Sequence, residues 1–226
     1  MDAAGEQRLR SGRHELPREA VVRSQRERLT RAIAERCEEV GYAETKIADI
    51  VDRAGVSRAT FYELYDGKED LFLAALDAIR ERCLAQVAAA ARPEDPWPDR
   101  VRAGIEALLG FFADEPVLAR LLMVEVFAAG AAARERYEET AREFAARFDQ
   151  GRPDSGGEPL VGAAATRAVF GGGELLVREE ILAGRVSELR RLLPELIYAA
   201  LVPFVGAEEA QHQMRRAQSG RRADAA

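Results

Sequence analysis

The chain has 226 residues but only two cysteines and two histidines, and these shortages limit its possible chemistry. Cys37 and Cys83 each lie within an apolar helical pattern, so we expect buried, reduced thiols and no disulfide framework. His14 and His212 fall in expected tails, and no cluster with the spacing of metal ligands accompanies them. The sequence therefore predicts neither a metal site nor a cofactor, and it offers little to an enzyme.

Long apolar runs are also missing. No stretch approaches the ~18 residues needed to cross a bilayer, and MDAAGEQRLRSGRHELPRE lacks the apolar segment of a secretory signal. Apolar residues make up 47% of the chain and charged residues 32%, a balance typical of globular proteins with a real core. We expect a cytoplasmic protein with no membrane partner.

The chain is acidic as a whole, with a net charge of −6, which argues against a general nucleic-acid binder. The charge is unevenly spread, however. Residues 8–31 contain eight arginines and three glutamates, a local charge of +5. Residues 1–23 are therefore expected to form a disordered basic arm. The arm either contacts DNA locally or is simply a solvated tail.

The most informative stretch, Thr45–Lys68, predicts two short helices joined by a tight turn. The first helix has one apolar face, formed by Ile47, Ile50, Val51 and Ala54. Thr45 is its expected N-cap, and Gly55 should end it because glycine adopts left-handed backbone at little cost. Ser57 is expected to cap the second helix, and Phe61 to form its buried face.

The second helix is too short to exist for packing alone, and its other face carries Arg58, Ala59, Thr60 and Tyr62. This pattern is typical of a helix-turn-helix, in which one helix braces and the next enters a DNA major groove. Arg58 could donate two hydrogen bonds to a guanine, worth about 1–3 kcal/mol of discrimination. Alternatively, it meets only phosphate.

The remainder predicts helices without alternating strand patterns. One helix, at 24–40, precedes the motif, and another, at 68–91, follows it and connects a DNA-binding domain (24–70) to a helical body (71–205). Further helices are expected over 99–113, 117–129, 131–149, 160–183 and 186–205. Pro194 should kink the last of these. Residues 206–226 have almost nothing to bury and are expected to be disordered.

Residues 26–76 resemble the TetR family of bacterial transcriptional regulators. The resemblance rests on VGY at the end of the first helix, the turn AGVS, the FY pair and the lysine that opens the next helix. It implies an all-α fold, in which a three-helix unit is linked by a fourth helix to a ligand-binding and dimerisation domain. It also implies a homodimer that pairs through residues 160–183 and 186–205.

The resemblance implies that Arg58, Ala59 and Thr60 face base edges, whereas Tyr62 and Lys68 reach phosphates. The complete expected set of DNA-contacting residues is Thr45, Lys46, Ser57, Arg58, Ala59, Thr60, Tyr62, Tyr65 and Lys68. The sequence departs from the family at Leu64, where a histidine is common, and at the acidic Glu63 and Asp66. These departures weaken the contacts with phosphate that the resemblance implies.

A ligand-responsive regulator needs an enclosed pocket. The candidates for its lining are Phe112, Met123, Glu125, Phe127, Phe144, Phe148, Arg167, Phe170 and Glu174, with Phe111 as a further possibility; the aromatic residues could equally be plain core. Glu125 interrupts the apolar run LLMVEVFAA. It either binds a cationic or hydrogen-donating ligand or pairs with an arginine such as Arg120 or Arg167. Gly171–Gly173 favour close helix packing.

The sequence thus predicts a dimeric repressor that binds a palindromic double-stranded operator and is released by a small molecule. A regulator without a ligand, or an activator, is the first alternative, and a helical enzyme is a distant one. The effector and the operator sequence are not encoded in any motif of the chain.

Overall fold

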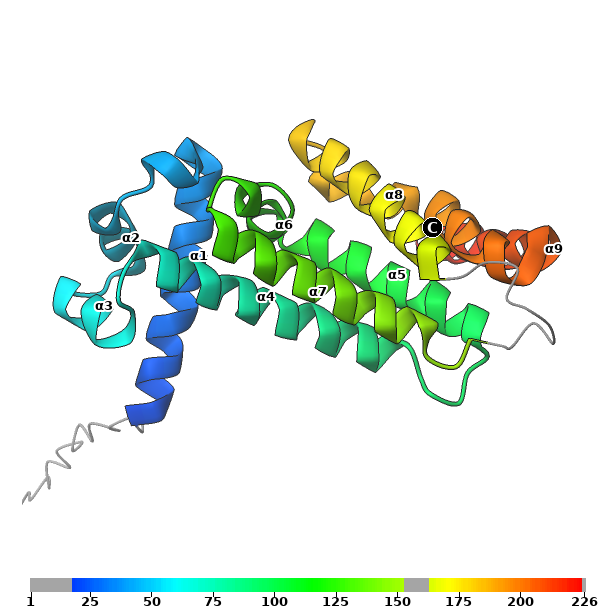
Figure 1. The fold of residues 1–226 in the computed structure, drawn as a ribbon, viewed down its shortest axis with the longest axis horizontal. Coiled ribbons are helices and arrows are strands. Elements are labelled where there is room, and N and C mark those ends of the chain that lie inside the picture. Colours follow the sequence, from blue (N-terminus) through cyan, green and yellow to red (C-terminus); the bar gives the residue numbers. More distant parts are fainter. Residues whose placement is uncertain (1–17, 153–162, 225–226) are drawn as a thin grey trace, which may run out of the picture.

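The computed structural model describes residues 18–152 and 163–224, and every regular element in these ranges is helical, as expected (Figure 1). The N-terminal unit consists of α1 (Arg18–Glu44), α2 (Ile47–Ala54) and α3 (Arg58–Leu64). The body follows, formed by α4 (Lys68–Ala90), α5 (Trp97–Asp114), α6 (Pro116–Met123), the 3₁₀-helix η1 (Glu125–Phe127), α7 (Ala131–Asp149), α8 (Ala163–Leu182), the 3₁₀-helix η2 (Val186–Leu192) and α9 (Leu193–Asp224). Within the described ranges, no helix is both long and apolar enough to cross a membrane.

The N-terminal unit packs around a small apolar core. Leu29, Ile33, Ile50, Phe61 and Phe72 are all fully buried there. Gly41 ends the regular part of α1 with a φ of 80°, a left-handed backbone that glycine adopts without strain.

The two cysteines are free and buried, in agreement with the prediction. Burial raises the pKa of the Cys37 thiol to about 11 and that of Cys83 to about 12. Both thiols therefore stay protonated at neutral pH and behave as small apolar core residues.

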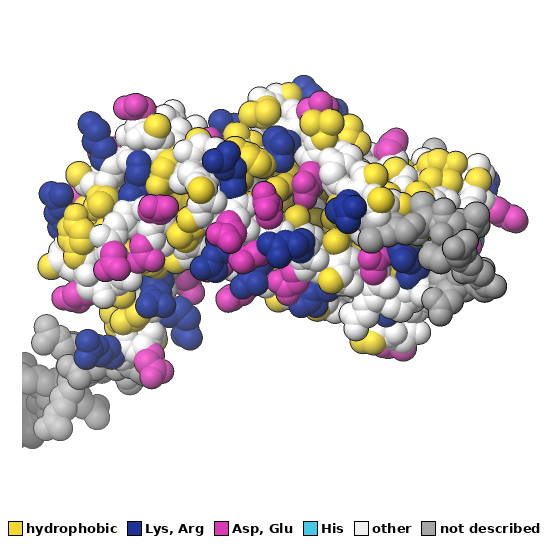
Figure 2. Space-filling view, in the orientation of Figure 1, with side chains coloured by type: hydrophobic (Ala, Val, Ile, Leu, Met, Phe, Trp, Pro, Cys, Tyr) yellow, Lys and Arg dark blue, Asp and Glu magenta, His cyan; other side chains and the backbone are white. Residues whose placement is uncertain are grey.

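Helix α4 leaves the N-terminal unit and runs through the body, where it packs against α5 and α7 (Figure 1). Helix α5 lies between α4 and the C-terminal segments η2 and α9. Along the face formed by α4 and α7, acidic and basic side chains are mixed rather than segregated (Figure 2). This face therefore lacks the single-sign charge expected of a surface that binds nucleic acid.

Two expectations about helix boundaries are wrong. The helix predicted over 117–129 is broken at Val124, where α6 ends and η1 begins. Pro194 does not kink a helix, because it lies in the first turn of α9, where its missing N–H has no intrahelical partner to lose. Pro203 is the proline inside α9.

The expectation of disorder over 206–226 is also wrong for the residues that the structure describes. Gly206 changes the direction of α9, and the helix then continues to Asp224. Gln213 is only 1% exposed and accepts a hydrogen bond from Arg102 of α5 at 3.2 Å. Arg216 forms an ion pair with Asp99, also on α5. These polar contacts add to the burial of Ala210 and Ala217, and composition alone does not reveal them.

The boundary expected for the basic arm, at residue 23, differs from the start of α1 in the structure. Residues 18–23 form the first turns of α1, whereas residues 1–17 lie outside the described ranges.

Candidate nucleic-acid interface and effector cavity

The turn between α2 and α3 is fixed by local hydrogen bonds and by one side chain from α1. Gly55 adopts a φ of 61° at the end of α2, which confirms its predicted role. The Ser57 hydroxyl accepts the Thr60 N–H at 3.0 Å, which confirms the predicted cap of α3. The Arg28 guanidinium donates to the carbonyl oxygens of Ala54 and Gly55 at 2.8 and 3.2 Å. The left-handed Gly55, the Ser57 cap and the Arg28 hydrogen bonds therefore fix the turn between the two short helices together.

Helix α3 presents its polar side to solvent. Ser57, Arg58 and Ala59 are exposed, and Tyr62 is 51% exposed although its neighbour Phe61 is fully buried. Arg58 forms no ion pair with any residue that the structure describes. Its guanidinium is thus available for an external partner. Thr60 is half-buried, and its hydroxyl lies 2.9 Å from that of Ser57. Lys46, just before α2, is exposed as well.

Two other residues expected to contact DNA are buried. Thr45 is 2% exposed, and its hydroxyl donates to the Gly41 carbonyl oxygen at 2.8 Å. The structure makes Lys46 the N-cap of α2, so the predicted capping role of Thr45 is wrong. Tyr65 is buried against Phe61, with ring centres 6.0 Å apart.

Lys68 is occupied within the protein. Its Nζ donates to the carbonyl oxygens of Tyr42, Ala43 and Thr45 at 2.8, 3.3 and 3.0 Å, and lies 4.2 Å from the centre of the Tyr42 ring. An ammonium group has three N–H donors, so none remains for a phosphate in this conformation. Lys68 instead ties the start of α4 to the last residues of α1 and to Thr45, which follows it.

The body contains a partly open cavity of about 650 Å³ between α5, α6, α7, α8 and α9. Six of the predicted ligand-binding residues line it: Phe112, Met123, Phe144, Phe148, Phe170 and Glu174. Tyr137 and Thr140 of α7, which were not among those candidates, add two hydroxyl groups to the wall. Tyr137 and Thr140 lie seven and four residues before Phe144, which places them on the same helical face, a signal that the sequence does contain.

Small residues help to create this cavity. Gly172 and Gly173 line it, and a Cβ atom built at Gly172 would meet no atom within 4 Å. Gly171 has the same free space but lines neither cavity described here. The prediction of close helix packing at these glycines is therefore wrong for Gly171 and Gly172. Gly173 contacts Leu196 at an ordinary 3.7 Å.

Beside the cavity, Arg178 forms hydrogen bonds with two residues that line it. Arg178 donates to the Met123 carbonyl oxygen at 2.9 Å and to the Tyr137 hydroxyl at 3.3 Å. Its guanidinium also lies 4.3 Å from the ring centre of Phe127. Burial raises the pKa of the Glu174 carboxyl, and nearby Tyr137 and Arg178 only partly oppose this.

The remaining predicted ligand-binding residues lie elsewhere. Phe111 is buried core, Arg167 is exposed, and neither they nor Phe127 and Glu125 line the cavity. The alternative in which Glu125 pairs with Arg120 is confirmed, because their charged atoms lie 3.4 Å apart.

Glu125 also joins the body to the N-terminal unit. It is 5% exposed, and its carboxylate accepts the Tyr42 N–H at 3.0 Å. Nearby, Glu115 accepts from Arg31 of α1 at 2.7 Å and from Arg82 of α4 at 2.6 Å. Burial pushes the pKa of Glu115 upward, but the two arginines lower it overall, so this carboxylate stays charged.

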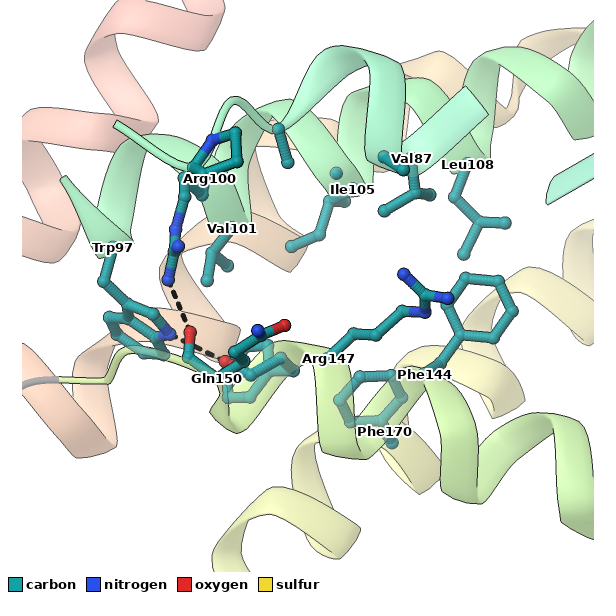
Figure 3. A pocket seen from close by; sticks show the side chains of 15 residues that line it. Val87, Trp97, Arg100, Val101, Ile105, Leu108, Phe144, Arg147, Gln150 and Phe170 are labelled. Carbon is teal, nitrogen blue, oxygen red and sulfur yellow. Dashed lines mark hydrogen bonds between the residues drawn. The ribbon is translucent and has the colours of Figure 1, made fainter. Parts of the chain in front are cut away.

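A second, smaller cavity of about 260 Å³ lies beside the first, between α4, α5 and α7 (Figure 3). The two cavities share Ile105, Leu108, Phe144, Phe148 and Phe170. Trp97 closes one end of the smaller cavity, and its indole N–H donates to the Phe148 carbonyl oxygen at 2.7 Å. Arg100, Arg147 and Gln150 supply its polar side chains.

The helix-turn-helix geometry agrees with a comparison to protein families. The model of bacterial regulatory proteins of the tetR family matches residues 29–75, which span α2, α3 and the adjoining parts of α1 and α4. Residues 29–75 therefore form a DNA-binding domain of the TetR family. The chain is accordingly a DNA-binding transcriptional regulator and not an enzyme.

Solved structures of TetR-family and related regulators share the whole fold. The fatty acid degradation regulator FadR from Bacillus halodurans aligns with a TM-score of 0.71 and 15% identity, over 81% of this chain and 96% of that one. FadR from Bacillus subtilis, solved in complex with stearoyl-CoA, gives 0.66 and 15%, over 80% and 98%. A gamma-butyrolactone receptor, described as ArpA-like, gives 0.63 and 17%, over 88% and 99%. No curated protein sequence matches the chain.

These identities are low, so they establish the fold of this TetR-family regulator and not its ligand. The residues that could meet DNA and those that line the cavity must be argued from its own geometry.

Proposed function

We propose that this TetR-family regulator is a cytoplasmic homodimeric repressor, released from a palindromic operator by a small, largely apolar ligand. The observation that carries the proposal is the 650 Å³ cavity in the body, which has the size and apolar lining of small-molecule sites. A regulator without a ligand would be expected to have a fully packed body, so the cavity counts against that alternative. The solved relatives add support, since one holds stearoyl-CoA and another is described as a butyrolactone receptor.

The proposed DNA contacts come from one surface. Lys46, Ser57, Arg58, Ala59, Thr60 and Tyr62 together form the side of the N-terminal unit that is open to a major groove. In a dimer, two such units should meet half-sites about 34–36 Å apart, one turn of DNA. Thr45, Tyr65 and Lys68 are better explained as residues that hold this surface in place.

Dimerisation is supported by exposed apolar side chains of α8. Leu175, Leu176 and Leu182 are large apolar side chains that remain exposed on this helix, and the first two also border the cavity. Exposed apolar residues that gather on one helix are typical of protein–protein interfaces. We propose that α8, together with α9, pairs with the same helices of a second copy.

Release requires that ligand binding and DNA binding favour different arrangements of the same protein. A short connection supports this. Met123 lines the cavity, and its carbonyl oxygen is held by Arg178. Two residues later, Glu125 accepts the N–H of Tyr42 at the end of α1. A ligand that displaces Met123 would therefore act on the segment that carries the helix-turn-helix.

The test begins with selection of DNA sequences that the purified protein binds. Stearoyl-CoA and unesterified fatty acids then serve as probes for release, followed by fluorescence anisotropy of the labelled operator. Gly172→Leu should fill the cavity without a backbone clash, so it should keep operator affinity but abolish release.

Gly171→Leu is the matched control, because it adds the same side chain one residue earlier, outside the cavity. It should leave release by the ligand intact. Equal loss of release in both variants, or unchanged release in Gly172→Leu, would contradict the assignment of the cavity as the effector site.

A further inference from the structure

The two neighbouring cavities differ in chemistry although their walls are shared. The larger one is apolar apart from Tyr137, Thr140 and Glu174. The smaller one contains two guanidinium groups, those of Arg100 and Arg147, and no acidic side chain of the described residues lines it. The environment therefore changes from apolar to cationic along one continuous row of aromatic and aliphatic side chains.

Arg147 extends across the smaller cavity, with Val87 and Leu108 on one side and Phe170 on the other (Figure 3). Its only ion pair among the described residues is with Glu143 at 3.3 Å, one turn away on the same helix. Glu143 also accepts from Arg80 of α4 at 3.1 Å. One carboxylate thus serves two arginines, and the charge of Arg147 is only partly neutralised.

Arg100 lies at the other side of the same space. It donates to the Gln150 carbonyl oxygen, as the dashed line in Figure 3 marks. No ion pair links it to a carboxylate among the residues that the structure describes. This guanidinium borders an apolar cavity and donates to a neutral carbonyl oxygen. It can exchange that hydrogen bond for a stronger, charge-assisted one to an anion.

We infer that the effector is an amphipathic anion, whose alkyl chain fills the larger cavity and whose anionic head group binds Arg100 and Arg147 in the smaller one. This inference rests on the proposed function, because it names the ligand class of the same cavity. Glu174 in the larger cavity would repel an anion there, so it sets the direction in which the molecule lies. A carboxylate and a phosphate both suit the arginine pair, and the experiment distinguishes a fatty acid from an acyl-CoA.

Trp97 provides a direct measurement. It is the only tryptophan of the chain, it is 4% exposed, and it lines the smaller cavity. Its fluorescence should change when a head group binds nearby, and this signal does not depend on DNA. The probes are dodecanoate, dodecanoyl-CoA and the neutral 1-dodecanol, which differ in head group but share chain length.

The wild-type protein should bind at least one of the two anions about tenfold more tightly than dodecanol. Arg147→Gln and Arg100→Gln should each weaken binding of that anion by about tenfold and leave dodecanol unchanged, whereas Arg147→Lys should restore part of the loss. Arg142→Gln is the matched control, since Arg142 lies exposed on the same helix and outside both cavities. Thermal unfolding of each variant checks that it is folded.

Equal affinity for dodecanol and both anions, equal weakening of all probes in Arg147→Gln and Arg100→Gln, or no binding of any probe would overturn the inference. These results differ from a failure of the proposed function. If an anion binds as expected but the operator is not released, the head-group site stands and the release mechanism fails. If only a neutral molecule releases the operator, the repressor proposal stands and the anion assignment fails.

Discussion

The N-terminal unit and the cavity region of the body are built in opposite ways. In the N-terminal unit, several of the contacts that shape the helix-turn-helix join residues close in sequence. Ser57 caps α3 by accepting the Thr60 N–H, and Gly55 ends α2. The cavity wall instead collects residues from Ile105 to Ala200, carried by five helices. The unit that reads DNA is therefore locally determined and tightly packed, whereas the proposed sensor depends on how distant helices leave space between them.

The two regions meet at Tyr42. Its N–H is accepted by Glu125 of the body, and its carbonyl oxygen accepts from Lys68 at the start of α4. The sequence left Glu125 open between ligand binding and pairing with an arginine, and it assigned Lys68 to DNA. Both side chains instead hold the junction between the N-terminal unit and the body. A structural change in the body can be transmitted to the N-terminal unit at this junction.

The largest expected effect comes from removing a core side chain of the N-terminal unit. Phe61→Ala should cost about 3–5 kcal/mol of the free energy of unfolding, since Phe61 is fully buried. Phe170→Ala is the control from the cavity wall. Phe170 is only half-buried and already borders empty space, so its loss should cost less than half as much. Urea unfolding of both variants measures the contrast, and equal costs would mean that the two regions are packed alike.

Lys68→Met sharpens the comparison at the junction. It removes three hydrogen bonds from a charged donor to the end of α1 and to Thr45, so we expect a loss of about 2–3 kcal/mol in the free energy of unfolding. The dependence of DNA affinity on salt concentration should keep its slope. A slope that falls by about one unit, with little change in stability, would instead support a direct phosphate contact.

Arg58→Ala should act only on DNA recognition. Because Arg58 is exposed and pairs with no described residue, the free energy of unfolding should change by less than about 0.5 kcal/mol. Discrimination between operator sequences should fall by about 1–3 kcal/mol at one base pair of each half-site. Competition binding with single-base operator variants measures this. Uniform weakening across all sequences would show that Arg58 meets phosphate alone.

The smallest effect should be the pH dependence produced by Glu174. Burial raises the pKa of this carboxyl in the folded protein, so the folded state holds the proton more tightly than the unfolded chain does. Its contribution to stability is therefore fully present below the ordinary pKa of glutamate and is lost as the pH rises through the folded value. Glu174→Gln should raise the melting temperature slightly at pH 7 relative to wild type, with no gain at pH 4. A gain that is the same at both pH values would contradict this origin.

The sequence by itself determined most of the helix order and the position of the helix-turn-helix. Helical periodicity, glycine at position 55 and a serine cap at position 57 are local signals, and the structure has the corresponding features within a few residues of the predicted positions. The signals succeed because backbone conformation at a cap or a turn depends on the residue itself and on partners three or four positions away.

Only the tertiary structure decided which side chains remain available. Thr45, Lys68 and Glu125 are polar residues that the sequence offers to DNA or ligand, yet each is satisfied by partners that the fold brings to it. The helix beyond Gly206 and the free space beside Gly172 also follow from the tertiary structure and not from local sequence. The physical reason is that hydrogen-bond satisfaction and empty volume belong to the arrangement of packed helices, and neither is a property of any one segment.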